Sequence, residues 1–327
     1  MLKYHKYFYA LSLAVTVIGI ASLLLFGLRF GTDFIGGSSM EVQFSVGRPS
    51  HQEIIQKLSD LNLGDISIRN SGEKSVIMRF KSVDETTHQA ILSHLKEIQQ
   101  PGSTPSINSG QASSPQSDSE QAPQEGSDAT IAESQFDSIG PAIGKETQQR
   151  SMYAMGLVIF MIALYVTWAF RKVSYPLGSS KYGIITIITL FHDVIITVGI
   201  FSILGYFFSI EIGVPFIAAL LTVLGYSVND TIVVFDRIRE NLARQRAQFS
   251  FAEIVDTSMR ETVVRSINTS LTAFVALCAV LIFGGESIRY FILTLVIGVV
   301  VGTYSSIWIA SPLLVTWHDF VRRRVIR

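Results

Sequence analysis

One aspartate of this sequence lies inside a long apolar stretch, where a charge is costly. The segment Leu221–Asn241 begins as an apolar run, passes through Asn229 and Asp230, and stays apolar until Asp236. A carboxylate in such a run costs roughly 2.5–3.5 kcal/mol on membrane-insertion scales. It therefore needs a partner, a path for water or a proton. We interpret Asp230, with Asn229 beside it, as a proton-exchanging site; the simpler alternative is a helix cap near the membrane surface.

A basic residue stands where a later apolar run begins. Arg265 immediately precedes the segment Ser266–Leu271, and this run enters the membrane from the side on which the Asp230 run leaves it. The two side chains can therefore lie at similar depth. A guanidinium beside a carboxylate stabilises the charged form, and its withdrawal favours protonation. The pair Asp230 and Arg265 thus predicts a proton switch.

Two further ionisable residues, His192 and Asp193, lie near the middle of another apolar run. Ionisable side chains at that depth rarely face lipid. His192 can relay protons because the reference pKa of histidine lies near neutrality, or it can bond a carbonyl group on a neighbouring helix. Function and inter-helix bonding are equally open for Asp193. Because the two residues are consecutive, we expect them on different faces of their helix.

Membrane helices must position these side chains. The chain has 327 residues, of which 48% are hydrophobic, and its formal charges cancel. A soluble protein rarely combines such composition with long uncharged runs. Runs able to cross about 30 Å of hydrocarbon occur near residues 8–28, 152–170, 183–208, 212–235, 267–284 and 288–316. The sequence predicts an α-helical polytopic membrane protein with six transmembrane helices.

Basic residues predict the orientation of these helices. The short flanks on one side, which include residues 1–7, the loop 236–266 and the C-terminus, hold fifteen Lys and Arg, whereas the opposite short loops hold only Arg289. Since basic loops stay in the cytoplasm, both termini are predicted to be cytoplasmic. The first run, within residues 1–28, lacks a small-residue cleavage motif and is expected to be retained. Residues 151–327 supply the other five helices.

Residues 29–150 are then expected to form an extracytoplasmic α+β domain. Residues 101–130 are rich in Ser, Gln, Pro and Gly with few apolar side chains, which predicts a disordered linker. Elsewhere, alternation and helical spacing predict the order β-α-β-β-α-β of a ferredoxin-like domain. The expected elements are a strand at 39–44, a helix at 51–61 capped by Ser50, a hairpin at 66–80, a helix at 83–98 and a strand at 134–139.

Glycine-containing motifs border this domain on both sides. Glycine allows sharp turns and close backbone approach, and an aspartate can bond nearby amides. We therefore expect stiff hinges that pass movements of the helices to the domain. The residues concerned are Asp33, Gly36 and Gly37 on one side, and Gly140, Pro141 and Gly144 on the other.

Several classes of protein are disfavoured by what the sequence lacks. It contains no P-loop, no metalloprotease motif and no Cys/His cluster, and Cys278 is the single cysteine. The arginines of 236–266 accompany no nucleic-acid-binding motif and fit a solvated, lipid-headgroup-facing surface. We expect no enzymatic activity, cofactor, metal or nucleic acid. An ion gradient is the expected source of energy.

Three motifs resemble those of the SecF family, the smaller membrane subunits of the bacterial SecD–SecF complex. LGYSVNDTIVVFDRIREN contains Asp230, GTDFIGG resembles a GxDFxGG motif shared by SecD and SecF, and GPAIGKE resembles GPxVGxE with Ile143 in place of Val. The resemblance spans about residues 7–100 and 131–320. It implies that Asp230 and Arg265 are the functional pair of this family.

The resemblance also implies a function and partners. A member of this family pairs with SecD, associates with the SecY-E-G channel complex in the bacterial inner membrane, and uses the proton motive force to promote preprotein translocation. SecD and SecF together form a pseudo-symmetric unit of the resistance–nodulation–division (RND) type. Two alternatives stay open: a small-solute exporter of that superfamily, disfavoured by the single compact external domain, and a purely structural assembly subunit.

The predicted orientation can be tested with reporter fusions. Because basic residues concentrate on one side, a reporter enzyme fused after Arg327 is expected to be active only in the cytoplasm, and one inserted at Ser109 only outside the membrane. Activity on the opposite side at either site would contradict the six-helix orientation.

Overall fold

The computed structural model describes residues 1–45, 47–72, 74–99, 131–171, 177–245 and 248–325, so the predicted linker lies outside the described residues. The chain divides into two compact units. One contains Met1–Phe34 and Glu146–Arg327, and the other contains Ile35–Lys145. We call them the helix bundle and the β domain.

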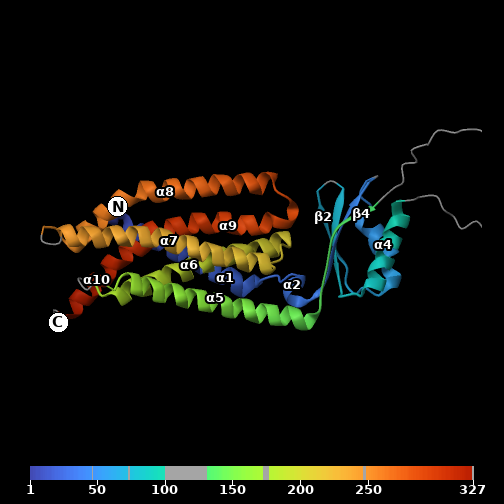
Figure 1. Cartoon of the computed structure of the whole chain (residues 1–327), viewed down its shortest axis with the longest axis horizontal. Helices are drawn as coiled ribbons and strands as arrows, with labels where there is room; N and C mark the ends of the chain where they lie inside the picture. Colours follow the sequence, from blue (N-terminus) through green and yellow to red (C-terminus); the bar gives the residue numbers. More distant parts are fainter. Residues whose placement is uncertain (46, 73, 100–130, 172–176, 246–247, 326–327) are drawn as a thin grey trace, which may run out of the picture. The chain divides into compact units, whose positions relative to one another are not determined.

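The long helices of the bundle lie side by side (Figure 1). Six helices of the described residues are long and apolar enough to cross a membrane, which confirms the predicted number. The last of them continues through a π-helical turn, η3, into α10. They are α1 (His5–Phe26, after the 3-10 turn η1, Leu2–Tyr4), α5 (Pro141–Ala169), α6 (Ser179–Phe208), α7 (Val214–Gln245), α8 (Phe251–Phe283) and α9 (Glu286–Ser305) with η3 (Ser306–Ala310) and α10 (Ser311–Val325).

Helices α1 and α6 run in the same direction and approach each other most closely where two glycines meet. A Cβ atom on Gly199 would lie 2.5 Å from the Cα of Gly19. Beside this crossing the hydroxyl of Ser22 donates to the carbonyl of Gly199 at 3.0 Å, and that of Ser202 donates to the carbonyl of Ser22 at 2.9 Å. Small residues allow such close approach in membranes. The crossing fixes the register of α1 against α6.

Helices α7 and α9 also meet through glycines. A Cβ on Gly298 would lie 2.1 Å from Val223, and one on Gly302 would lie 2.9 Å from the Cβ of Ser227. Glycines at this four-residue spacing let two helix backbones approach closely. The contact brings the polar side chains of α7 near those at the end of α9.

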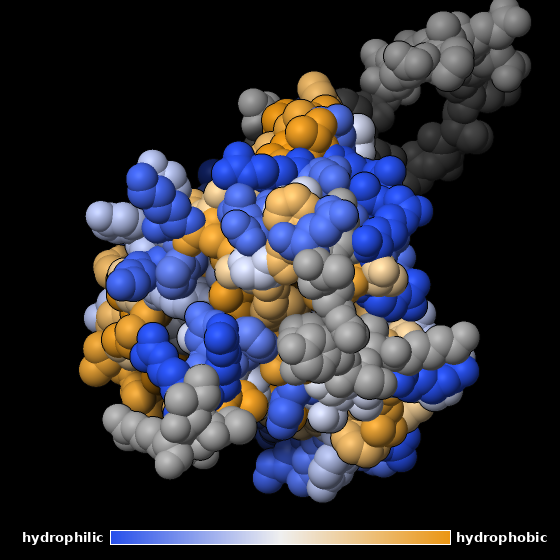
Figure 2. Space-filling view, turned by 90° about the vertical axis from the view of Figure 1, so that its left-hand side faces the viewer, coloured by the Kyte–Doolittle hydropathy of each residue, from blue (hydrophilic) through white to orange (hydrophobic). Residues whose placement is uncertain are grey.

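Charged side chains gather at one end of the bundle. Figure 1 places the N and C marks, the end of α7 and the start of α8 there, and Figure 2 shows hydrophilic side chains over much of this end. The guanidinium of Arg237 donates to Glu261 at 2.6 Å, and Asn241 donates to Glu261 at 2.8 Å and to Ser258 at 2.9 Å. These contacts join α7 to α8 at the charged end.

The β domain has a four-stranded antiparallel sheet in the order β2-β3-β1-β4. The predicted order β-α-β-β-α-β is present, while assignment to the ferredoxin-like class stays a prediction. The domain follows the short helix α2 (Thr32–Ile35). Its elements are β1 (Gly37–Phe44), α3 (His51–Lys57, followed by the 3-10 turn η2, Ser59–Leu61), β2 (Ser67–Ser71), β3 (Ser75–Phe80), α4 (Glu85–Gln99) and β4 (Ile131–Ile139).

One face of the sheet packs against α3 and α4. Alternate residues of β1 and β3 are fully buried there against apolar residues of the two helices, among them Met40, Val42, Phe44, Ile54, Leu58, Ile91 and Leu95. Ser50 caps α3 as predicted, within a capping box that includes Glu53. The side chain of Ile55, by contrast, is 44% exposed. It follows Ile54, whose position faces the core, by about 100° of helix rotation.

The α1–α6 crossing yields a test of stability. Gly199→Ala introduces a methyl group where backbone atoms of α1 already lie, so we expect a loss of about 1–3 kcal/mol, as for other overpacked sites. The control Gly156→Ala adds its Cβ where no atom lies within 4 Å. It is expected to be neutral or to stabilise α5 by up to about 1 kcal/mol. Thermal unfolding in detergent measures both variants, and equal midpoints would contradict the tight crossing.

Candidate functional site

Asp193 of α6 is fully buried and receives hydrogen bonds from two other helices. Its Oδ2 accepts from the hydroxyl of Ser227 on α7 at 2.6 Å and from that of Ser305 on α9 at 2.8 Å. Its Oδ1 lies 2.9 Å from Nδ1 of His192. A buried carboxylate needs such donors in place of water. Asp193 therefore holds α6, α7 and α9 together.

His192 extends this cluster to α1. Its Nε2 lies 2.6 Å from the hydroxyl of Ser12, and both side chains are buried. His192 points toward α1 and Asp193 toward α7 and α9, as expected for consecutive residues on different faces, yet the two side chains also bond each other. The Cα–Cβ bonds of consecutive residues point apart on a helix. The Nδ1 atom of a histidine ring, which lies nearest the backbone, can nevertheless turn toward the side chain of the next residue. Backbone direction alone therefore does not decide whether two consecutive side chains can bond.

Serines and a threonine complete the cluster, and sequence reasoning did not single them out for it. The hydroxyls of Thr231 and Ser306 lie 2.8 Å apart, and Ser306 donates to the carbonyl of Ser227 at 3.1 Å. Ser306 begins the π-helical turn η3, a feature often found at functional sites. Isolated hydroxyl residues in apolar runs give little signal in a sequence. The four-residue spacing of Ser227 and Thr231, on the helix of Asp230, was the available indication.

Asp230 has a different environment from Asp193. It lies about one turn beyond Ser227 on α7, its side chain is 8% exposed, and its Oδ2 is buried. The hydroxyl of Ser266 approaches it from α8. Yet within the described residues neither Asp230 Oδ2 nor Ser266 Oγ completes a hydrogen bond. A carboxyl group that is buried and incompletely bonded is suited to gain and lose a proton.

Ser266 differs from its neighbours on α8 in the same respect. The hydroxyls of Ser258, Thr262 and Ser270 each donate to the carbonyl four residues earlier. Ser266 makes no such bond within the described residues. Its hydroxyl is therefore available to Asp230, and it belongs to the candidate site although sequence reasoning did not select it.

Arg265 does not pair with Asp230 in this structure. Its side chain is exposed, and it makes no ion pair with the residues that the structure describes. The inward face of α8 is formed by buried residues four positions apart, including Ser266. Arg265 precedes Ser266 by one residue and points about 100° away. Asn229 on α7 is exposed as well. The sequence predicted the position of Arg265 along the helix but not the direction of its side chain.

The hinge residues occupy both borders of the β domain. Gly36 and Gly37 have φ angles of +83° and +130°, values that favour glycine. A Cβ on Gly36 would lie 2.6 Å from the Cα of Pro141, which is the first residue of α5. Gly140 directly precedes that helix. Gly144 lies within α5, so the expected second hinge ends at Gly140.

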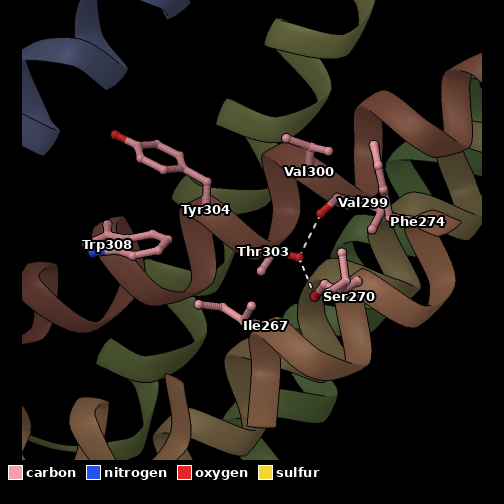
Figure 3. Close-up of a pocket in the computed structure, with 9 residues that line it drawn as sticks. Ile267, Ser270, Phe274, Val299, Val300, Thr303, Tyr304 and Trp308 are labelled. Carbon is pink, nitrogen blue, oxygen red and sulfur yellow. Dashed lines mark hydrogen bonds between the residues drawn. The ribbon is translucent and has the colours of Figure 1, made fainter. Parts of the chain in front are cut away.

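An apolar groove of about 360 Å³ lies between α8 and α9, continuing to η3 (Figure 3). The hydroxyl oxygen of Thr303 lies 2.6 Å from that of Ser270 and 2.7 Å from the carbonyl oxygen of Val299, so these polar atoms are bonded to one another. The other lining is mainly aliphatic and aromatic, including Phe274 and Trp308. This groove suits hydrocarbon and not an ion. No cluster of three potential metal ligands occurs among the described residues.

Comparison with protein-family models places most of the chain in one family. The model described as protein export membrane protein SecD/SecF, C-terminal, matches residues 120–319, and the SecD/SecF GG motif matches residues 21–46. The second match contains Asp33, Gly36 and Gly37. The first contains Asp193, Asp230 and Arg265.

Named relatives and solved structures agree with these matches. Protein translocase subunit SecF of Thermobaculum terrenum is 41% identical over 98% of this chain and 95% of its own length, and that of Anaerolinea thermophila is 35% identical over 95% and 92%. A crystal structure of SecDF from Thermus matches 97% of this chain and 38% of that protein, with 28% identity and a TM-score of 0.75. The chain is a multi-pass membrane protein of the SecF family of protein translocase subunits.

Proposed function

We propose that this subunit of the protein export machinery couples proton movement to preprotein translocation, with Asp230 as the group that exchanges the proton. The observation that carries the proposal is the buried Oδ2 of Asp230, which has no hydrogen-bond partner among the described residues. Asp193, the other buried carboxylate among the described residues, is bonded on both oxygens. The carboxylate of Asp230 is therefore poorly stabilised in its charged form, so gaining or losing a proton changes its interactions with the surrounding helices.

The energies involved are of comparable size. A charged carboxylate within the membrane costs roughly 2.5–3.5 kcal/mol on insertion scales. One elementary charge moving through the membrane potential releases about 2.3 kcal/mol per 100 mV. The gradient can therefore decide whether Asp230 is neutral, and each protonation state favours the conformation that solvates it better.

The cluster around Asp193 has a positioning role in this proposal. Its hydrogen bonds join α1, α6, α7 and α9, and one of them holds Ser227, one turn from Asp230. His192 also offers a second site for a proton, since the hydroxyl of Ser12 can either donate to Nε2 or accept from it. We therefore assign the pair to proton coupling, with Asp193 as the anchor and His192 as the exchangeable group.

A polar stripe on α8 provides the binding surface for a partner subunit. It consists of Arg265, Asn268, Thr269 and Thr272, which are all exposed at helical spacing. Only 11% of the membrane-spanning window of α8 is buried inside this chain, against 50% for α7. Guanidinium and amide groups in a membrane require polar partners. Asn229 on α7 is exposed as well, on the side of that helix away from Ser227.

SecD is the partner that we propose for this surface. The relative named SecDF in Bacillus subtilis is 34% identical over 95% of this chain, which covers 37% of that protein, so the SecF-like part there belongs to a longer chain. An acidic or amide side chain of SecD at the depth of Arg265 would complete the proton path. The apolar groove of Figure 3 would face membrane lipid.

The proposed setting is the bacterial inner membrane, with both termini in the cytoplasm. The charged end of the bundle fits the cytoplasmic side, where basic residues are retained. The SecY-E-G channel and preproteins are the further partners in this proposal, and no enzymatic step or cofactor is involved. The relatives named as translocase subunits favour this function over a small-solute exporter.

The carboxyl group of Asp230 gives the first test of function. Asp230→Asn mimics the protonated form, so we expect it to abolish the stimulation of protein export by an imposed proton gradient while leaving assembly intact. Export into vesicles measures the first effect, and co-purification of SecD measures the second. Asp236→Asn is the control, because Asp236 is half exposed and pairs with Arg239 at the surface. Retention of the gradient response by Asp230→Asn would show that this carboxyl group is structural.

Arg265 gives a separate test of the partner surface. Removing one member of a desolvated charged pair typically costs about 2–5 kcal/mol, so Arg265→Ala is expected to lower the amount of SecD that co-purifies by at least about tenfold. Arg260→Ala on the same helix is the control, since Arg260 pairs with Asp256 within this chain. Equal recovery of SecD with both variants would place the interface elsewhere.

A further inference from the structure

Asp33 connects the segment after α1 with the start of α7. Its Oδ2 accepts a hydrogen bond of 2.7 Å from the backbone N–H of Val214, the first residue of α7. The first N–H groups of a helix have no partner within it and carry the positive end of the helix dipole. The carboxylate therefore caps α7, although it comes from a residue 181 positions earlier in the chain.

The surroundings of this cap are closely fitted. A Cβ on Gly213 would lie 2.3 Å from Oδ2 of Asp33. Two backbone hydrogen bonds of 2.8 Å hold the same segment, from Gly31 N–H to the carbonyl of Ile212 and from Ile212 N–H to the carbonyl of Arg29. Residues 29–34 are thus fixed to the connection between α6 and α7.

Helix α7 is also the helix that carries Asp230. It is continuous from Val214 to Gln245, and the separation of sixteen positions between Val214 and Asp230 corresponds to about 24 Å along its axis. An unbroken helix passes a shift or tilt at its middle to its end. Asp33 receives that movement, and β1, a central strand of the sheet, begins four residues later at Gly37.

We propose that Asp33 is a positioning residue that couples α7 to the β domain. Its carboxylate makes the chain leading into β1 follow the start of α7, so a change at Asp230 reaches the sheet. The close contact of Gly36 with Pro141 makes the start of α5 follow as well. This inference rests on the proposed role of Asp230, and it adds the route by which that role reaches the β domain.

Hydrogen–deuterium exchange of the full chain in lipid nanodiscs tests this coupling. The measured quantity is the change that Asp230→Asn produces in the exchange of peptides covering β1 and β4. We expect this change to be about fivefold, the size of shift that loss of one helix cap produces. In an Asp33→Ala background it should disappear. In an Asp33→Asn background it should persist, because the amide oxygen can accept the same hydrogen bond from Val214.

Rescue by Asp33→Asn separates coupling from a simple contribution to stability. Thr32→Ala is the control that alters the same short helix and leaves the carboxylate in place. If Asp33→Ala fails to fold, Gly213→Ala displaces the carboxylate without removing it and should abolish the response in the same way.

Two results would overturn the inference. One is a full response of β1 to Asp230→Asn without the Asp33 carboxylate, and the other is no response of β1 in the otherwise unchanged chain. The proposed function fails on a different measurement, namely gradient-stimulated export that survives Asp230→Asn. The two failures are therefore distinguishable.

Discussion

A carboxylate in the apolar interior of a membrane protein must be given hydrogen-bond donors, and in this chain Asp193 obtains them from His192, Ser227 and Ser305. The donors stand on three helices, so satisfying one charge determines how α6, α7 and α9 are arranged. Glycines at the helix crossings make these short distances possible, because Gly302 lies against Ser227. Since removing any donor leaves the buried carboxylate underbonded, this cluster forms a fixed frame.

Asp230 lies next to that frame without sharing its donors. Ser227 is held by Asp193, whereas Asp230 and Ser266, about one turn away, leave polar atoms unbonded within the described residues. A rigid cluster beside an underbonded carboxyl group lets one protonation event act on a helix whose other contacts stay fixed. In the coupling that we propose, helix α7 carries the change to its first turn, where the carboxylate of Asp33 accepts a hydrogen bond from the N–H of Val214.

Much of this could be predicted from the sequence, because hydrophobic runs and charge bias are strong signals. The six helices, the depth of Asp230 and the strands at Met40 and Met78 follow from periodicity alone. The bond between His192 and Asp193, the outward direction of Arg265 and the roles of Ser12 and Ser305 could not. Each depends on the rotation of one helix against another, which is set by tertiary packing and not by local spacing. Resemblance to a family supplied the proposed pair of Asp230 and Arg265, but not the direction of their side chains.

The central claim is that Asp230 exchanges a proton within the membrane while Asp193 keeps its hydrogen-bonded state. Infrared difference spectroscopy of the full chain in lipid, recorded between acidic and neutral pH, measures this directly through the C=O stretching band of a protonated carboxylic acid. Because exposed Asp and Glu side chains also contribute to this band once protonated, the account predicts that one carboxyl component of the band is lost in Asp230→Asn and persists in Asp193→Asn, provided that this variant folds. A band that survives in Asp230→Asn with unchanged intensity would contradict it.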